Sequence, residues 1–206
     1  MKRPLQNPIV LLALVAVLVA GCANTRINSV WKDPVYQGHP SRIMVIGVVK
    51  NPATRRILED EFVRQLRAHG AQAIASYTEL PDAQQGNDEA IADKVLQAGV
   101  DTVLITRLVG KNTLQVYVPG TPYYPPPQYG TWKNYYRYGH QAMYTPDHLV
   151  EEEYAVIETN LYETANNNLV WSASSETGLS GASQPLAKPY VSVIVDSMIE
   201  HGLLNK

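Results

Sequence analysis

The feature that most constrains the fold of this 206-residue chain is a short apolar run, RIMVIGVVK, at residues 42–50. Nearly every position from Ile43 to Val49 is apolar, without the alternation of a strand that has one wet face. Such a run is typical of a strand covered on both faces. Asn51-Pro52 then ends it. The sequence therefore predicts an inner strand between two layers.

Helix and strand patterns alternate after this run. Gly70 and Gly99 each follow a stretch of helical periodicity, where a left-handed cap is expected. Helices that connect successive strands predict parallel pairing between those strands. The expected elements are helices at 53–69 and 88–98 and strands at 71–77 and 101–110.

The first helix carries opposite charges four residues apart, Arg55 with Glu59 and Arg56 with Asp60. Pairs at this spacing stabilise an exposed helix by about 0.2–0.5 kcal/mol each. We therefore expect these side chains on the solvated face. Paired arginines at a helix start can also bind an anion, but no glycine-rich phosphate loop precedes them.

The C-terminal third predicts antiparallel strands and a last helix. Residues 151–163 alternate in polarity, three asparagines at 166–168 signal a turn, and 169–176 return as the second strand of a hairpin. Apolar residues at 191–199 recur at helical spacing. The fold class predicted is α/β (α+β), a mixed sheet with helices packed on it, formed by one domain over 42–206.

The N-terminus has the layout of a bacterial export signal. A basic start precedes twelve uninterrupted apolar residues at 9–20, and small residues lead to Cys22. Twelve residues are too few to cross a bilayer core, which needs about 20. Val-Ala-Gly-Cys at 19–22 resembles the lipobox of bacterial lipoproteins. The resemblance implies a signal peptide at 1–21, cleavage before Cys22 and lipid on its thiol.

Cys22 is the only cysteine of the chain, so it cannot form an internal disulfide. Residues 22–41 are interpreted as a lipidated tether that ends in a brief strand or docked segment. Lipoproteins carry at least two acyl chains, which anchor a protein stably. Ala23 follows the cysteine, and in the better-known sorting systems the absence of aspartate there implies the outer membrane and its periplasmic face.

Removal of residues 1–21 leaves 15 Lys and Arg against 19 Asp and Glu, a net charge of −4. A nucleic-acid-binding domain needs a strong basic patch. We therefore expect no nucleic-acid partner.

A Tyr- and Pro-rich insertion occupies residues 119–148. Connections this long without periodicity are often functional or disordered, and prolines stiffen the first half. Tyrosine suits protein interfaces and also stacks on sugar rings; alternatively, the insertion folds back and covers apolar surface. The candidate partner- or glycan-binding residues are Tyr123, Tyr124, Tyr129, Trp132, Tyr135, Tyr136 and Tyr138.

No catalytic set emerges from the sequence. His140 and His148 match no strong zinc spacing, and no Gly-x-Ser-x-Gly motif of a serine hydrolase occurs. The acidic triplet 151–153 lies on one strand, where neighbours point to opposite faces and cannot pair across a cleft. We expect no enzyme, no cofactor and no metal.

Three stretches resemble uncharacterised proteobacterial lipoproteins: SVWKDPVYQG (29–38), RIMVIGVVKNPATRRILEDEFVRQL (42–66) and ASYTELP (75–81). The expected fold resembles the N-terminal domain of TolB and the lipoproteins LpoB and PelC. The resemblance implies a non-enzymatic interaction or assembly module of the cell envelope. Its partner would be an unknown envelope protein, and a homo-oligomer is left open. The alternative is a glycan or peptidoglycan binder that uses the Tyr-rich insertion.

Overall fold

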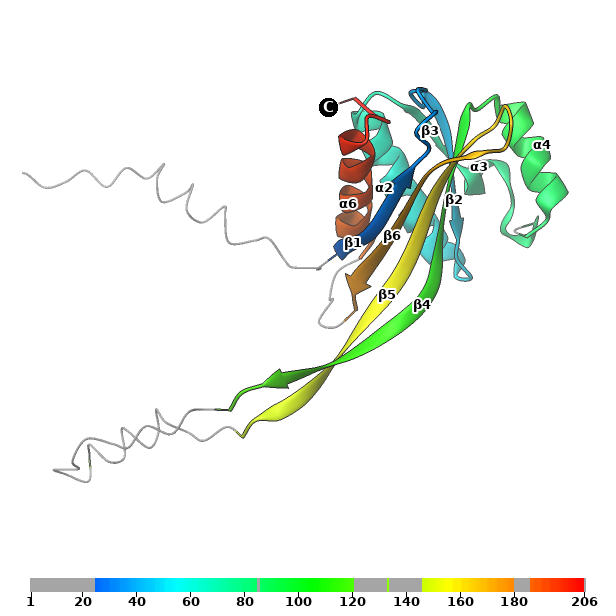
Figure 1. The fold of residues 1–206 in the computed structure, drawn as a ribbon. Helices are drawn as coiled ribbons and strands as arrows, with labels where there is room; N and C mark the ends of the chain where they lie inside the picture. Colours follow the sequence, from blue (N-terminus) through cyan, green and yellow to red (C-terminus); the bar gives the residue numbers. More distant parts are fainter. Residues whose placement is uncertain (1–24, 85, 121–132, 134–145, 180–185, 206) are drawn as a thin grey trace, which may run out of the picture.

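A computed structural model describes residues 25–84, 86–120, 133, 146–179 and 186–205. Its centre is a six-stranded sheet in the order β1-β6-β5-β4-β2-β3 (Figure 1). β2 runs parallel to β3 and β4, and the remaining neighbours are antiparallel. The predicted mixed sheet is thus confirmed. The strands are β1 Thr25–Lys32, β2 Arg42–Val48, β3 Gln72–Ala75, β4 Thr102–Val118, β5 His148–Glu163 and β6 Leu169–Gly178.

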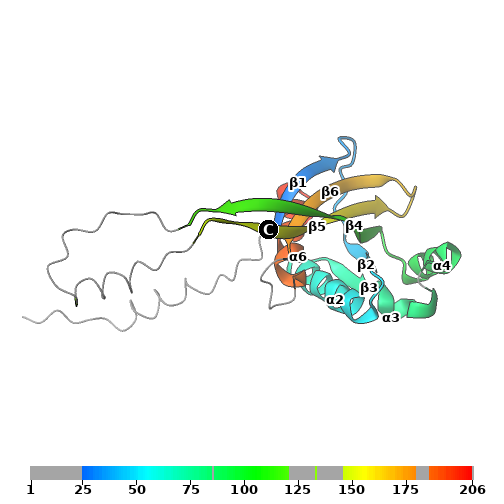
Figure 2. The same ribbon diagram turned by 90° about the horizontal axis from the view of Figure 1, so that it is seen from below.

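Helices cover both faces of the parallel half of the sheet (Figure 2). Ile43 and Val45 of β2 face α2 and α6, whereas Met44 and Ile46 face α4. The alternation of a strand sends neighbouring side chains to opposite faces, so both sets are buried. This confirms the inner strand predicted from residues 42–50. The helices are α2 Pro52–Ala68, α3 Ser76–Glu79, α4 Asp88–Ala98 and α6 Ala187–Glu200, with a short 3₁₀ turn η2 at Asp82–Gln84.

Local sequence signals set the ends of α2 and α4. The Asn51 side chain accepts from the backbone N–H groups of Ala53 and Thr54 at 2.9 and 3.1 Å, which caps α2. Gly99 adopts a left-handed conformation with φ of 58° after α4, where a side chain would be strained.

The main core lies between the sheet and the pair α2 and α6. Trp171 of β6 and Phe62 of α2 are fully buried within it. The ring of Phe62 meets that of Tyr190 of α6 edge-on, with centroids 5.9 Å apart. These aromatic contacts hold the two helices together over the sheet.

Residues 25–32 form β1 at the edge of the sheet, so the tether predicted for 22–41 contains a full strand. β1 pairs with β6 from Thr25↔Thr177 to Lys32↔Trp171. Composition misled the prediction because an edge strand with one exposed face needs few apolar residues. Within the described residues, the sheet therefore begins at Thr25 rather than at residue 42.

β4 and β5 are longer than predicted and extend beyond the rest of the sheet. β4 was expected to end at residue 110, but it continues to Val118 through a bulge between Leu108 and Gly110. β4 pairs with β2 only as far as Arg107, and β5 pairs with β6 only from Tyr154 onward. Residues 113–118 and 148–153 therefore form a two-stranded ribbon, here called the arm, which projects from the body (Figure 1).

Candidate functional site

Every site residue predicted from the sequence lies outside the described residues. Lipidation of Cys22 and binding by the aromatic side chains accordingly remain predictions. The arm ends at Val118 and His148, so the insertion leaves the molecule from its tip. The aromatic residues concerned are Tyr123, Tyr124, Tyr129, Trp132, Tyr135, Tyr136 and Tyr138.

One face of the arm is apolar and exposed. Val116 pairs with Val150, and Leu114 pairs with Glu152, so these side chains share a face. Leu114, Val116 and Val150 keep 46, 38 and 37% of their surface exposed. An isolated two-stranded ribbon is only marginally stable in water. The arm therefore presents apolar area that a partner could bury.

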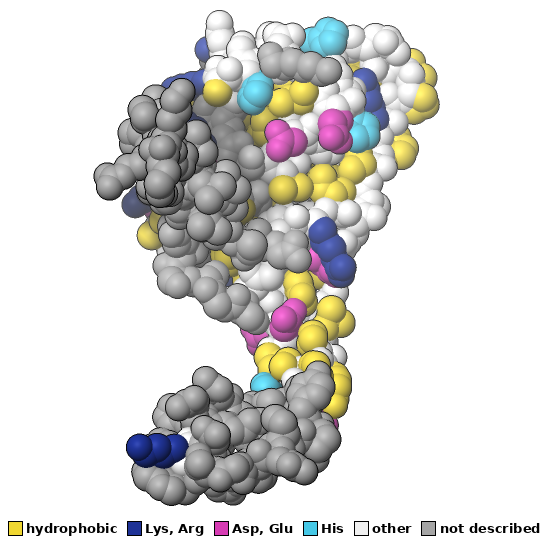
Figure 3. All heavy atoms as spheres, turned by 90° about the vertical axis from the view of Figure 1, so that its left-hand side faces the viewer, with side chains coloured by type: hydrophobic (Ala, Val, Ile, Leu, Met, Phe, Trp, Pro, Cys, Tyr) yellow, Lys and Arg dark blue, Asp and Glu magenta, His cyan; other side chains and the backbone are white. Residues whose placement is uncertain are grey.

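The opposite face of the arm is more polar near its root. Thr113 lies across from Glu153, and Gln115 lies across from Glu151. The Lys111 ammonium contacts the Glu153 carboxylate at 3.4 Å in an exposed pair, which contributes at most about 1 kcal/mol. Figure 3 shows the arm as a narrow neck with hydrophobic and acidic side chains side by side.

A polar cluster joins β1 to the root of the arm. The Arg26 guanidinium donates to the Glu176 carboxylate at 2.7 Å, and the Asn112 amide donates to its other oxygen at 2.8 Å. The hydrogen bond from Arg26, and then that from Asn112, lowers the pKa of Glu176 below its usual range. Arg26 also lies 6.0 Å from the ring centroid of Tyr154. The first strand is thereby tied to the strands that form the arm.

An open apolar groove of about 390 Å³ lies on the helix side of the sheet, at the root of the arm. Its walls come from the start of α2, the start of α6 and strands β4, β5 and β6. A cavity of this size is in the range of small-molecule sites. The apolar residues that line it include Val49, Ile57, Leu58, Leu108, Ile157 and Leu186.

Three hydroxyl groups are bonded to one another beside this groove. The Tyr190 hydroxyl lies 2.6 Å from Thr106 Oγ1 and 2.5 Å from Thr159 Oγ1. Burial raises the pKa of Tyr190 to about 12, so the phenol is neutral at physiological pH. Tyr190 and Thr106 line the groove. Since their hydroxyls are satisfied internally, the groove is suited to an apolar ligand.

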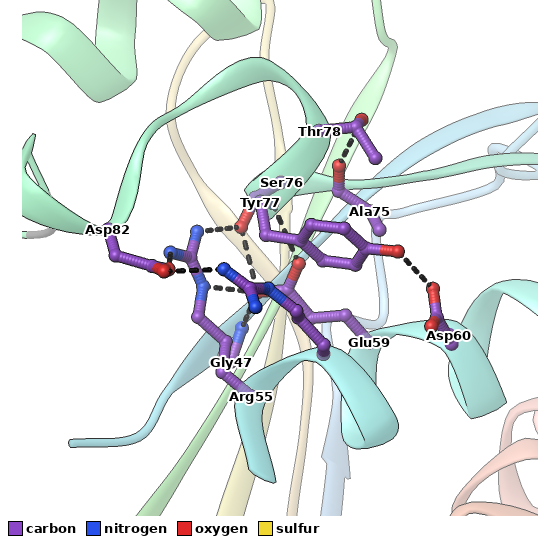
Figure 4. A network of polar contacts seen from close by, with 10 residues as sticks. Gly47, Arg55, Glu59, Asp60, Ala75, Ser76, Tyr77, Thr78 and Asp82 are labelled. Carbon is purple, nitrogen blue, oxygen red and sulfur yellow. Dashed lines mark hydrogen bonds and ion pairs between the residues drawn. The ribbon is translucent and has the colours of Figure 1, made fainter. Parts of the chain in front are cut away.

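A buried ion pair lies under the start of α2 (Figure 4). The Arg55 guanidinium donates to Glu59 Oε1 at 2.9 Å, and both side chains are fully buried. Arg55 also donates to Ser76 Oγ at 2.8 Å and to Asp82 at 3.1 Å. Glu59 accepts from the backbone N–H of Tyr77 at 3.0 Å. The network joins α2 to β2, α3 and the turn η2.

The prediction that Arg55 and Glu59 lie on the solvated face of the helix is wrong. A pair four residues apart has the same sequence pattern on either face of a helix. The acceptors and donors that complete the network, Ser76 and Asp82, come from another part of the chain. Because Arg55 is already bound by its three partners, the network is a structural element rather than an anion site.

Neither a metal centre nor a spanning helix is found in the part of the chain that the structure describes. No group of three His, Cys, Asp or Glu side chains there is placed to hold a metal ion. Among the same residues, no helix is both long and apolar enough to cross a bilayer.

Comparison with solved structures finds loose likenesses of fold. PelC from Paraburkholderia phytofirmans, a dodecamer, is 14% identical with a TM-score of 0.47, covering 88% of this chain and 99% of that chain. Lipoprotein GNA1162 from Neisseria meningitidis is 15% identical with a TM-score of 0.42, covering 78% of this chain and 99% of that chain. No family model and no curated protein matches the chain.

Proposed function

We propose that this protein is a lipid-anchored, periplasm-facing protein of the outer membrane that acts as a non-enzymatic interaction module. The observation that carries the proposal is the arm, with Leu114, Val116 and Val150 exposed on one face. Exposed apolar side chains in a contiguous group mark interaction sites on soluble domains. The lipobox-like segment before Cys22 supports the anchor.

The partner proposed for the arm is another envelope protein. An apolar strand surface is complementary to apolar protein surface, and the aromatic insertion at the tip adds residues that are enriched in interfaces. A glycan or peptidoglycan partner is the alternative, in which the Tyr-rich insertion stacks on sugar rings. The two partners make different demands, because stacking needs the insertion whereas protein contact needs the arm as well.

The anchor is tested by the location of Cys22→Ser in fractionated cells. The proposal predicts that this variant leaves the membrane fraction, while the parent chain stays in it. If Cys22→Ser stays with the membrane to the same extent as the parent, the lipid anchor is excluded.

The interaction is tested by crosslinking in cells followed by affinity capture of the tagged protein. The double variant Leu114→Ser, Val116→Ser is expected to lose a partner that the parent captures. The matched control, Thr113→Ala with Gln115→Ala, changes the other face of the same strand and should keep that partner. Circular dichroism confirms that both variants fold.

Two results of this experiment would contradict the protein-partner proposal. Equal capture by both double variants would exclude the apolar face of the arm as the contact surface. Retention of isolated murein sacculi at high salt, lost with Tyr135→Ala and Tyr136→Ala but not with the arm variant, would favour the glycan alternative.

A further inference from the structure

The groove at the root of the arm exposes apolar side chains around a concave surface. Ile57 at its α2 wall is 51% exposed and Leu108 at its β4 wall is 54% exposed. The one cationic side chain among its lining residues, Arg107, donates to Glu158 at 2.7 Å. With the neighbouring hydroxyls bonded to each other, the groove offers contact area and no unmet charge.

The start of β1 lies against the same groove. Thr25 Oγ1 lies 3.0 Å from Thr177 Oγ1, and Thr177 is one of the lining residues. Cys22 precedes Thr25 by three residues. Three residues span at most about 10 Å, even fully extended. The thiol of Cys22 is therefore held close to the groove wall whatever path residues 22–24 take.

We propose that the groove holds an acyl chain of the lipid carried by Cys22; this inference rests on the lipidation in the proposed function. Each methylene moved from water into apolar surroundings contributes about 0.8 kcal/mol. Attachment to Cys22 makes the binding intramolecular, with an effective concentration in the millimolar range for a short link. The domain then sits against the lipid, and its arm points away from a fixed base.

The experiment uses the full chain in intact cells grown with a palmitate analogue that carries a diazirine. Irradiation links the acyl chain to whatever it contacts, and mass spectrometry of the purified protein identifies the linked peptides. Links from the N-terminal lipopeptide to peptides that contain Ile57 or Ala187 are expected. Ala187→Trp fills the groove and should lower those links about tenfold, the effect of losing about 1.4 kcal/mol of binding.

The matched control is Ala92→Trp, which adds the same ring to an exposed site on α4 away from the groove. It should leave the links unchanged. Ile57→Trp closes the groove from its other wall and replaces Ala187→Trp if that variant does not fold. A lipidated N-terminal peptide that links only to membrane phospholipid, or equally in all variants, overturns the inference. An N-terminal peptide without lipid mass overturns the proposed anchor instead.

Discussion

The buried pair Arg55–Glu59 gives the sharpest prediction of stability. Glu59→Leu removes a carboxylate that accepts four hydrogen bonds, from Gly47, Arg55, Ser76 and Tyr77. A buried group that loses its partner costs about 1–3 kcal/mol, and a buried charge costs more. Breaking a buried ion pair from one side costs about 3–5 kcal/mol in total. We expect Glu59→Leu to lower the free energy of unfolding by that amount.

Comparison with other variants separates burial from charge. Arg55→Met should cost less than Glu59→Leu, because Glu59 keeps the hydrogen bonds from Ser76 and from the Tyr77 backbone. The double variant Arg55→Met, Glu59→Leu should cost less than the sum of the single changes, since neither charge is left alone. Glu61→Ala breaks the exposed pair with Arg64 and should cost less than about 1 kcal/mol.

Urea unfolding followed by tryptophan fluorescence measures all four variants, because the fully buried Trp171 reports on the core. The reasoning is refuted if Glu59→Leu costs no more than Glu61→Ala. It is also refuted if the effects of Arg55→Met and Glu59→Leu simply add.

Three further predictions concern single side chains. Asn51→Ala removes the cap of α2 and should lower stability by about 1 kcal/mol in urea unfolding; no loss would exclude the cap. Tyr190→Phe leaves the Thr106 and Thr159 hydroxyls 3.2 Å apart and bonded to each other, so it should cost about 1 kcal/mol, and a loss above about 3 would contradict this. Arg26 and Asn112 lower the pKa of Glu176, so its contribution is present above the ordinary carboxyl pKa of about 4.3 and is lost as pH falls below it. Glu176→Gln should therefore weaken the loss of stability on acidification; an unchanged acid limb in pH-dependent unfolding would exclude the contribution.

The sequence predicts the parallel half of the fold well because its signals are local. The apolar run at 42–50 requires cover on both faces, and the structure supplies α2 and α6 on one face and α4 on the other. Gly99 and the asparagines at 166–168 mark turns by conformations that other residues adopt less easily. Asn167 indeed has φ of 59°.

The features that the sequence does not reveal depend on distant neighbours. β1 is a strand because β6 supplies its hydrogen-bond partners, and its own composition resembles a tether. Residues 109–112 read as the end of a strand, but a bulge carries β4 onward beside β5. The groove is assembled from five elements, and no single segment of sequence indicates it.

The most direct test of the central claim is photo-crosslinking from the two faces of the arm in cells. A photoreactive amino acid at Val116 probes the apolar face, and the same amino acid at Gln115 probes the opposite face one residue away. The account predicts a discrete crosslink to an envelope protein from Val116 and little or none from Gln115. Equal crosslinking from both positions, or none from Val116 while the protein remains lipidated and folded, would contradict it.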